Sequence, residues 1–81
     1  MGEEKRRGQL DIIAEILRQC LRGEKVTRIV YRSNINFKRF KVYIEYLTFK
    51  DFLEVVEGPK GTKIYRTTDK GRRFLELLEG E

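Results

Sequence analysis

The change in apolar spacing after Asp51 constrains the fold of this chain more than any other feature of its sequence. Before Asp51, apolar residues recur every three or four positions, which is the spacing of amphipathic helices. After it, two β-favouring segments, 53–57 and 63–67, flank the linker 58–62 of sequence GPKGT. Proline in the second position of that linker and glycine in the fourth suit a tight turn, so the two segments predict a β-hairpin. A helical first part followed by a hairpin predicts an α+β fold.

The first helix is predicted over residues 9–21, and Gly23 is expected to end it. Its expected apolar face carries Leu10, Ile13, Ile16, Leu17, Cys20 and Leu21. A free cysteine on such a face behaves as a small hydrophobic side chain, so we expect Cys20 in the core. Residues 1–7 are polar and charged, which predicts a flexible tail ahead of one domain over residues 8–81.

A helix-turn-helix pattern follows. A short helix is predicted over residues 28–32 with Thr27 as its N-cap, and Ser33 and Asn34 break it. The next helix is predicted over residues 36–50, with Asn36 as its N-cap. We expect its buried stripe to be Phe37, Phe40, Ile44 and Leu47, with Tyr43 at the edge of the stripe.

The last predicted element is a helix capped by Thr68 that runs to Leu78. The order of elements is therefore three helices, two strands and a short final helix. With 81 residues and no internal repeat, the chain is expected to form one domain.

The composition excludes most catalytic chemistry. With no histidine and a single cysteine, the chain lacks the residues for a Ser-His triad, a Cys-His dyad, a Cys/His zinc site or an internal disulfide. Asp11 and Glu15 could face a metal ion, but Arg18 lies within ion-pair reach of Glu15 and no third ligand is evident. We therefore expect neither an enzyme nor a bound cofactor or metal.

The longest fully apolar run, residues 12–14, is far too short to span a membrane, and we expect a cytoplasmic, nucleoid-associated protein.

The positive charge is concentrated in two segments. Residues 18–41 carry eight basic side chains against one acidic side chain, and residues 60–73 carry six against one, whereas the whole chain has a net charge of +5. Such segregation favours a polyanionic partner, because each neutralised phosphate releases condensed counterions. The alternative is the solvated surface of a heat-adapted protein, since 38% of the residues are charged and thermolabile residues are few.

Several segments resemble the small archaeal winged helix-turn-helix DNA-binding proteins, a family of transcription regulators. The resemblance covers residues 8–78 and is carried by KVTRIVY at 25–31, NINF at 34–37, YIEYL at 43–47 and YRTTDKGR at 65–72. It implies a winged helix with a three-helix core, a two-stranded wing over residues 53–67 and a short C-terminal helix. It also implies that the helix over residues 36–50 enters the major groove of duplex DNA, while the wing lies on the backbone or in the minor groove.

The residues expected to contact DNA are Arg28, Arg32, Asn36, Lys38, Arg39, Lys41, Val42, Lys60 and Lys63. Among them, Arg39 is expected to pair with guanine and Val42 to meet a thymine methyl group. Arg28 and Arg32, together with Lys60 and Lys63 on the wing, are expected to contact phosphates, which position a protein without reading sequence.

Two positions depart from the family pattern. Members often have glutamine where this chain has Arg39, so Arg39 cannot complete a capping box with Asn36 and is freer to face DNA. Members usually have glycine after the third helix, where this chain has Asp51. Either a left-handed conformation at Asp51 carries modest strain, or this end of the helix is shaped differently.

Assembly and partner class have open alternatives. The last helix is too short for a coiled coil, so the candidate homodimer patches are Phe74, Leu75 and Leu78 on that helix, or Tyr46 and Phe49 on the third. Instead of regulating transcription, the domain could serve as a protein-interaction module, a nonspecific chromatin-type protein or an RNA binder. RNA binding would use exposed aromatic rings, of which Tyr31, Tyr46 and Phe49 are the candidates.

Overall fold

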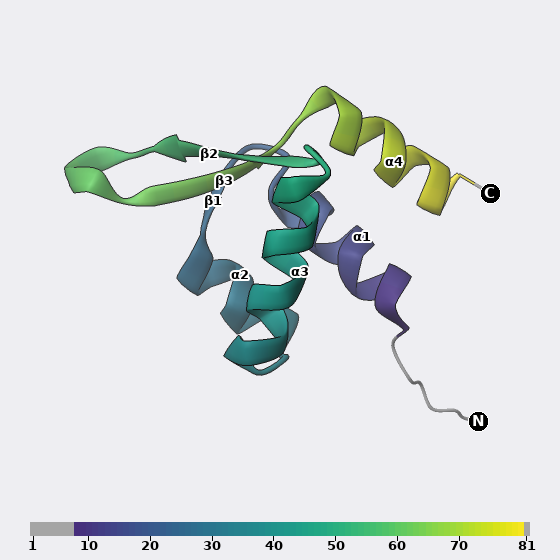
Figure 1. Cartoon of the computed structure of the whole chain (residues 1–81), viewed down its shortest axis with the longest axis horizontal. Coiled ribbons are helices and arrows are strands. Elements are labelled where there is room, and N and C mark those ends of the chain that lie inside the picture. The colour runs from purple at the N-terminus through teal and green to yellow at the C-terminus, as the bar shows by residue number, and fades with distance from the viewer. Residues whose placement is uncertain (1–7, 81) are drawn as a thin grey trace.

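The computed structural model describes residues 8–80 as four helices and a three-stranded antiparallel sheet (Figure 1). In chain order the elements are α1 (Gln9–Gln19), β1 (Glu24–Lys25), α2 (Val26–Ser33), α3 (Phe37–Phe49), β2 (Leu53–Glu57), the 3-10 turn η1 (Pro59–Gly61), β3 (Lys63–Thr67) and α4 (Asp69–Glu79). The expected α+β winged helix is confirmed, and both hairpin strands have the predicted bounds. We call β2, η1 and β3 the wing. The tail predicted for residues 1–7 lies outside the described residues.

Strand β1 is the element that the sequence did not predict. Glu24 pairs with Tyr65 and Lys25 with Ile64, so the sheet has the order β1-β3-β2 instead of two strands. Because the chain is extended through Lys25, α2 begins at Val26, and Lys25 is its N-cap without a side-chain hydrogen bond. The prediction of Thr27 as this cap is therefore wrong.

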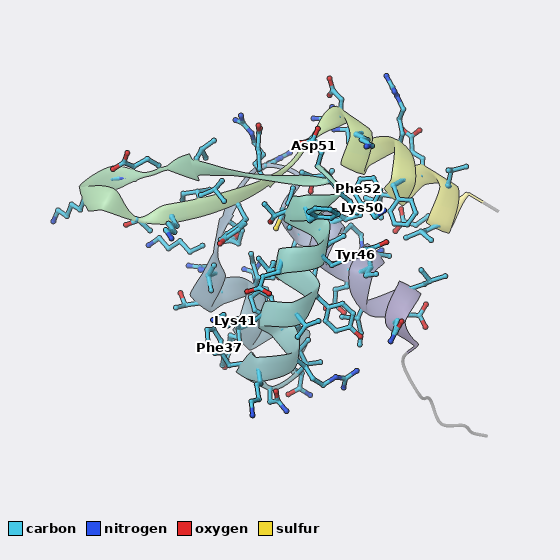
Figure 2. The ribbon with its side chains drawn as sticks, in the orientation of Figure 1. Phe37, Lys41, Tyr46, Lys50, Asp51 and Phe52 are labelled. Carbon is cyan, nitrogen blue, oxygen red and sulfur yellow. The ribbon has the colours of Figure 1, made fainter. Side chains whose placement is uncertain are left out.

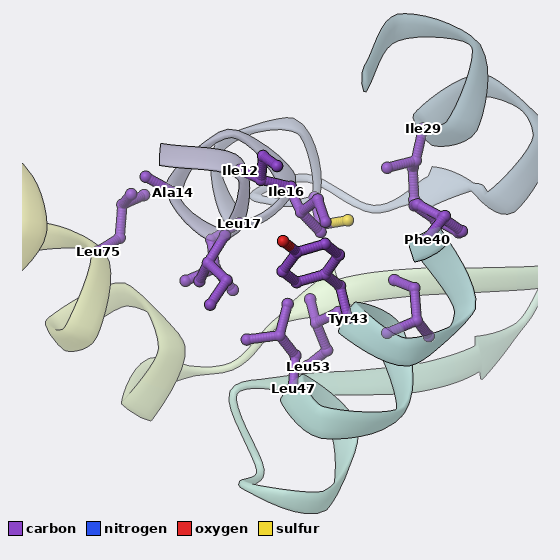
Figure 3. Packing of buried hydrophobic residues seen from close by; sticks show 13 residues of the cluster. Ile12, Ala14, Ile16, Leu17, Ile29, Phe40, Tyr43, Leu47, Leu53 and Leu75 are labelled. Carbon is purple, nitrogen blue, oxygen red and sulfur yellow. The ribbon is translucent and has the colours of Figure 1, made fainter. Parts of the chain in front are cut away.

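Helix α1 is buried on more than one side because both α2 and α4 pack against it. Ile12 and Ala14, which the predicted apolar face did not include, are buried, and Leu75 of α4 lies beside Ala14 (Figure 3). Leu10, at the start of the helix, is exposed instead. The core consists of Ile12, Ile13, Ala14, Ile16, Leu17, Cys20, Ile29, Phe40, Tyr43, Ile44, Leu47, Leu53 and Leu75.

Cys20 lies in this core as expected, and its side chain is fully buried. Burial raises the pKa of its thiol to about 12, with a further contribution from the negative charge of Glu24. The thiol therefore stays protonated at neutral pH and packs as an apolar group.

Helix α3 begins as predicted, because the Asn36 side chain accepts a hydrogen bond of 2.9 Å from the backbone N–H of Arg39. Its buried stripe differs from the prediction at two positions. Tyr43 is buried, whereas Phe37 remains 56% exposed. Phe37 is the first residue of α3, and it lies beside α2 in a shallow pocket outside the core.

Helix α4 is used for packing within the domain. Leu75 is buried, Phe74 stacks on Phe52 with ring centroids 4.5 Å apart, and Leu78 packs against the core. The predicted dimer patch of Phe74, Leu75 and Leu78 is therefore largely covered by the chain itself. Leu77 is the apolar residue of α4 that stays exposed.

Of the two alternatives at the end of α3, the structure has the left-handed one, at Asp51, which follows the C-cap Lys50. Asp51 has φ +66°, its N–H donates to the Thr48 carbonyl, and the Phe52 N–H donates to the Leu47 carbonyl. These two bonds form a Schellman motif, in which glycine is the favoured residue because a β-carbon is strained there. Among residues 8–80, no group donates a hydrogen bond to the Asp51 carboxylate that would offset this strain.

We expect Asp51→Gly to raise the free energy of unfolding by roughly 0.5 to 1 kcal/mol, because glycine adopts positive φ without a steric penalty. Asp51→Ala is the control: it removes the same charge but keeps a β-carbon at positive φ. Urea denaturation of the three proteins measures the effect. A gain of the same size in Asp51→Ala would show that charge, not backbone strain, is responsible.

The start of α4 requires close backbone contact. Thr68 is its N-cap as predicted, and the Thr68 hydroxyl accepts a hydrogen bond of 3.0 Å from the Gly71 N–H. A β-carbon built on Gly71 would lie 2.2 Å from the Phe52 carbonyl oxygen and 2.8 Å from the Thr67 methyl group. Because the nearest clash is with backbone, a side chain at this position would push α4 away from the sheet.

Gly71→Ala is therefore expected to destabilise the domain by roughly 1 to 3 kcal/mol, although alanine favours helices. The matched control is Arg73→Ala, an exposed position two residues further along the same helix, with an expected change within about 0.5 kcal/mol. Thermal unfolding of both variants provides the measurement. Equal stability of Gly71→Ala and the parent chain would contradict the close contact with Phe52.

Candidate nucleic-acid interface

Four lysines on α3 and the wing are exposed to solvent: Lys38, Lys41, Lys60 and Lys63. Within residues 8–80, no carboxylate oxygen lies within 4.0 Å of their amino groups, and every ion pair in this part of the chain uses an arginine. A free ammonium group on a flexible stem can approach a phosphate without first breaking a bond to the protein. These lysines form the part of the predicted site that is available to an anion.

The tip of the wing holds Lys60 away from the body of the domain. Its backbone is left-handed, with φ +57°, and the turn is closed by a hydrogen bond of 2.6 Å from the Gly58 N–H to the Thr62 carbonyl. The Thr62 hydroxyl also donates to the Pro59 carbonyl at 2.7 Å. The ordered turn positions a cation at the end of the longest projection of the fold (Figure 1).

Arg28 and Arg32 of α2, which are predicted to contact phosphate, both lie close to one carboxylate. Arg28 Nε and Arg32 Nη1 lie 3.7 and 3.8 Å from the carboxylate oxygens of Glu24, which belongs to β1. All three side chains remain partly exposed to solvent. A phosphate at this position would compete with Glu24 for the two guanidinium groups.

Arg39 and Val42 lie on the side of α3 that faces α1. They line a groove of about 490 Å³ with Gln9, Leu10, Ile13, Tyr43 and Tyr46. Arg39 Nη2 donates to the Tyr43 hydroxyl at 3.3 Å, and the guanidinium lies 6.0 Å from the centroid of the Tyr43 ring. Figure 2 shows Lys41 and Phe37 on the side of α3 that faces α2, and Tyr46 on the opposite side. The contact residues predicted on α3 therefore do not share one side of the helix: Arg39 and Val42 face α1, whereas Lys41 faces α2.

An apolar patch beside the lysines was not predicted. Phe37 and Tyr31, which is 86% exposed, line a pocket of about 280 Å³ with Val26, Thr27 and Val30. The helical spacing of the apolar residues predicts Phe37 in the core. Its exposure depends on where α2 lies, which the sequence does not give. No local signal in the sequence would have found this pocket.

The second predicted dimer patch remains open to solvent. Tyr46 is exposed on α3, with the Lys50 amino group 5.9 Å from its ring centroid, and Phe49 is 84% exposed. A homodimer through these two residues stays a prediction.

Within residues 8–80, no group of three His, Cys, Asp or Glu side chains could hold a metal ion. None of the described helices is long and apolar enough to cross a membrane.

Comparison with known proteins identifies the family. A family model described as winged helix-turn-helix matches residues 6–80. The chain belongs to the winged helix-turn-helix family. Two archaea, Methanocaldococcus jannaschii and Sulfolobus solfataricus, contain proteins similar to it. Uncharacterized protein MJ0290 of Methanocaldococcus jannaschii is 36% identical over 75 residues, which are 91% of this chain and 33% of that protein. This chain thus spans about a third of the length of that relative.

Two further proteins match over more of their length. Uncharacterized protein MJ0287 of the same organism is 30% identical over 74 residues, 90% of this chain and 71% of that protein. Among solved structures, the crystal structure of Sso10a-2, a DNA-binding protein from Sulfolobus solfataricus, is similar with a TM-score of 0.82 and 30% identity. The similarity covers 91% of this chain and 77% of that one.

Proposed function

We propose that this chain binds double-stranded DNA and regulates transcription, with α3 in the major groove and the wing on the backbone or in the minor groove. The observation that carries the proposal is the set of unpaired lysines on α3 and the wing. The similarity to Sso10a-2, which is described as a DNA-binding protein, supports the same partner.

The physical basis is electrostatic. Lys38 and Lys41 stand on the helix that winged-helix proteins insert into the major groove, and Lys60 and Lys63 stand on the wing. Four phosphates neutralised by these lysines would release their condensed counterions, which gives affinity for any duplex. Preference for one sequence would come from the side chains of α3 that reach base edges. Arg39 is one candidate for that role, which requires its guanidinium to leave the Tyr43 ring.

Titration of a fluorescent random-sequence duplex of about 20 base pairs at several salt concentrations tests this function. We expect the logarithm of affinity to fall with the logarithm of salt with a slope of about −3 to −4, for four phosphates at about 0.9 each. Lys41→Ala and Lys60→Ala should each make that slope shallower by about one, equally on all sequences. Arg73→Ala on α4, which lies on the opposite side of the molecule from the wing, is the control that removes the same charge (Figure 1).

Absence of duplex binding at low salt would contradict the proposal and favour a protein partner for α3. Equal or tighter binding of single-stranded RNA would favour RNA. Selection from a randomised duplex pool separates a regulator from a nonspecific chromatin-type protein. A regulator enriches one sequence motif, whereas a chromatin-type protein enriches none.

Removing the acidic partner of Arg28 and Arg32 should strengthen binding. We expect Glu24→Gln to raise duplex affinity roughly two- to fivefold at low salt, because exposed ion pairs are worth about 0.2 to 1 kcal/mol and both guanidinium groups become free. Glu79→Gln is the matched control: it also removes one negative charge and frees an arginine, Arg18, but between α1 and α4. The same gain in both variants would mean that net charge alone is responsible and that Arg28 and Arg32 do not face DNA.

A further inference from the structure

Phe37 is exposed at the start of α3 although it continues the apolar stripe of that helix. Its ring stacks obliquely on Phe40, with centroids 6.4 Å apart, and 56% of the residue remains open to solvent. Burying the ring in the core would remove this apolar surface from water, and the fold does not do so. Phe37 is therefore available to contact a partner.

The exposed ring belongs to an apolar pocket. This pocket has a volume of about 280 Å³, and residues of α2 line it together with Phe37: Val26, Thr27, Val30 and Tyr31. Single exposed hydrophobic side chains are common on protein surfaces, whereas apolar groups that converge on one hollow indicate a contact with an apolar group.

The pocket is next to the lysines. Phe37 and Lys41 are four residues apart, which makes them neighbours on the surface of a helix, and both lie on the side of α3 that faces α2 (Figure 2). Lys38 follows Phe37 in the same first turn, where recognition helices reach base edges. A duplex held by these lysines would meet the Phe37 ring in its major groove.

We propose that Phe37 and the pocket beside it receive the C5-methyl group of thymine, so that the chain prefers an A·T pair at that position. This inference rests on the proposed binding of duplex DNA. The methyl group of thymine is the apolar group that a base pair presents in the major groove, and aromatic rings contact it in known complexes. The lysines attract any phosphate equally, so an apolar contact supplies what they cannot: discrimination between bases.

The test removes one methyl group at a time from DNA. A preferred duplex is first selected from a randomised pool with the full chain, and each thymine of that duplex is then replaced by uracil, which pairs with adenine in the same way. We expect one or two replacements to weaken binding about fourfold, which is the effect of losing one buried methyl group. Phe37→Ala should bind the thymine and uracil duplexes equally, and Phe37→Leu should retain part of the difference.

Phe49→Ala is the matched control, because Phe49 is also an exposed aromatic residue of α3 but lies at its other end. It should keep the full difference between thymine and uracil. Thermal unfolding checks that Phe37→Ala remains folded, and Phe37→Leu provides a second variant with a smaller change in volume.

Two results would overturn the inference. Uracil could weaken binding at no position. It could also weaken binding equally in the parent chain and Phe37→Ala, so that the variant loses the same factor of affinity on thymine and uracil duplexes, which would assign the ring to the sugar-phosphate backbone. Salt-dependent duplex binding in either case leaves the proposed function intact, whereas absence of duplex binding overturns both.

Discussion

Thr67, the last residue of β3, and Thr68, which follows it, hold three helices in place. The Thr67 hydroxyl donates to the Leu17 carbonyl at 2.7 Å and the Thr67 N–H donates to the Cys20 carbonyl at 2.9 Å, which fixes the end of α1. The Thr68 hydroxyl donates to the Asp51 carbonyl at 2.6 Å and the Thr68 N–H donates to the Phe52 carbonyl at 3.0 Å, just after α3 ends. Thr68 also caps α4. The last carbonyls of a helix have no partner within it, so the buried bond from Thr67 to the Leu17 carbonyl satisfies a group whose burial would otherwise be costly.

This junction determines how the wing stands relative to α3. Residues 51 and 52 connect α3 to β2, and residues 67 and 68 connect β3 to α4, so hydrogen bonds between the two connections clamp the base of the wing. Gly71 allows α4 to approach the same point, and the Schellman motif fixes the direction in which the chain leaves α3. The lysines of α3 and those of the wing thus belong to two elements joined by a fixed connection. Under the proposed function, a rigid connection lets both contact one duplex without an entropic cost for ordering them.

Features set by neighbouring residues could be predicted from the sequence, and features set by distant ones could not. The hairpin 53–67 and the caps Asn36 and Thr68 depend on residues within a few positions, and the structure confirms them. Strand β1 has two residues, and its pairing with Tyr65 and Ile64 involves a partner some forty positions later. For the site, the exposure of the lysines follows from their charge, whereas the side of α3 on which Arg39 lies depends on Tyr43 and on the position of α1.

Arginine and lysine have different contacts in this structure, and this difference affects how well the surface could distinguish DNA sequences. Among residues 8–80, the ion pairs join Arg18, Arg28, Arg32, Arg66 and Arg72 to carboxylates. Arg39, the single arginine of α3, is held on Tyr43. Guanine is read best by the planar fork of arginine, whereas lysine acts as a point charge. A surface with free lysines and an engaged arginine therefore favours affinity over base discrimination. In this arrangement, the exposed apolar side chains of Phe37 and Val42 are groups of α3 that can distinguish one base pair from another without breaking a bond to the rest of the fold.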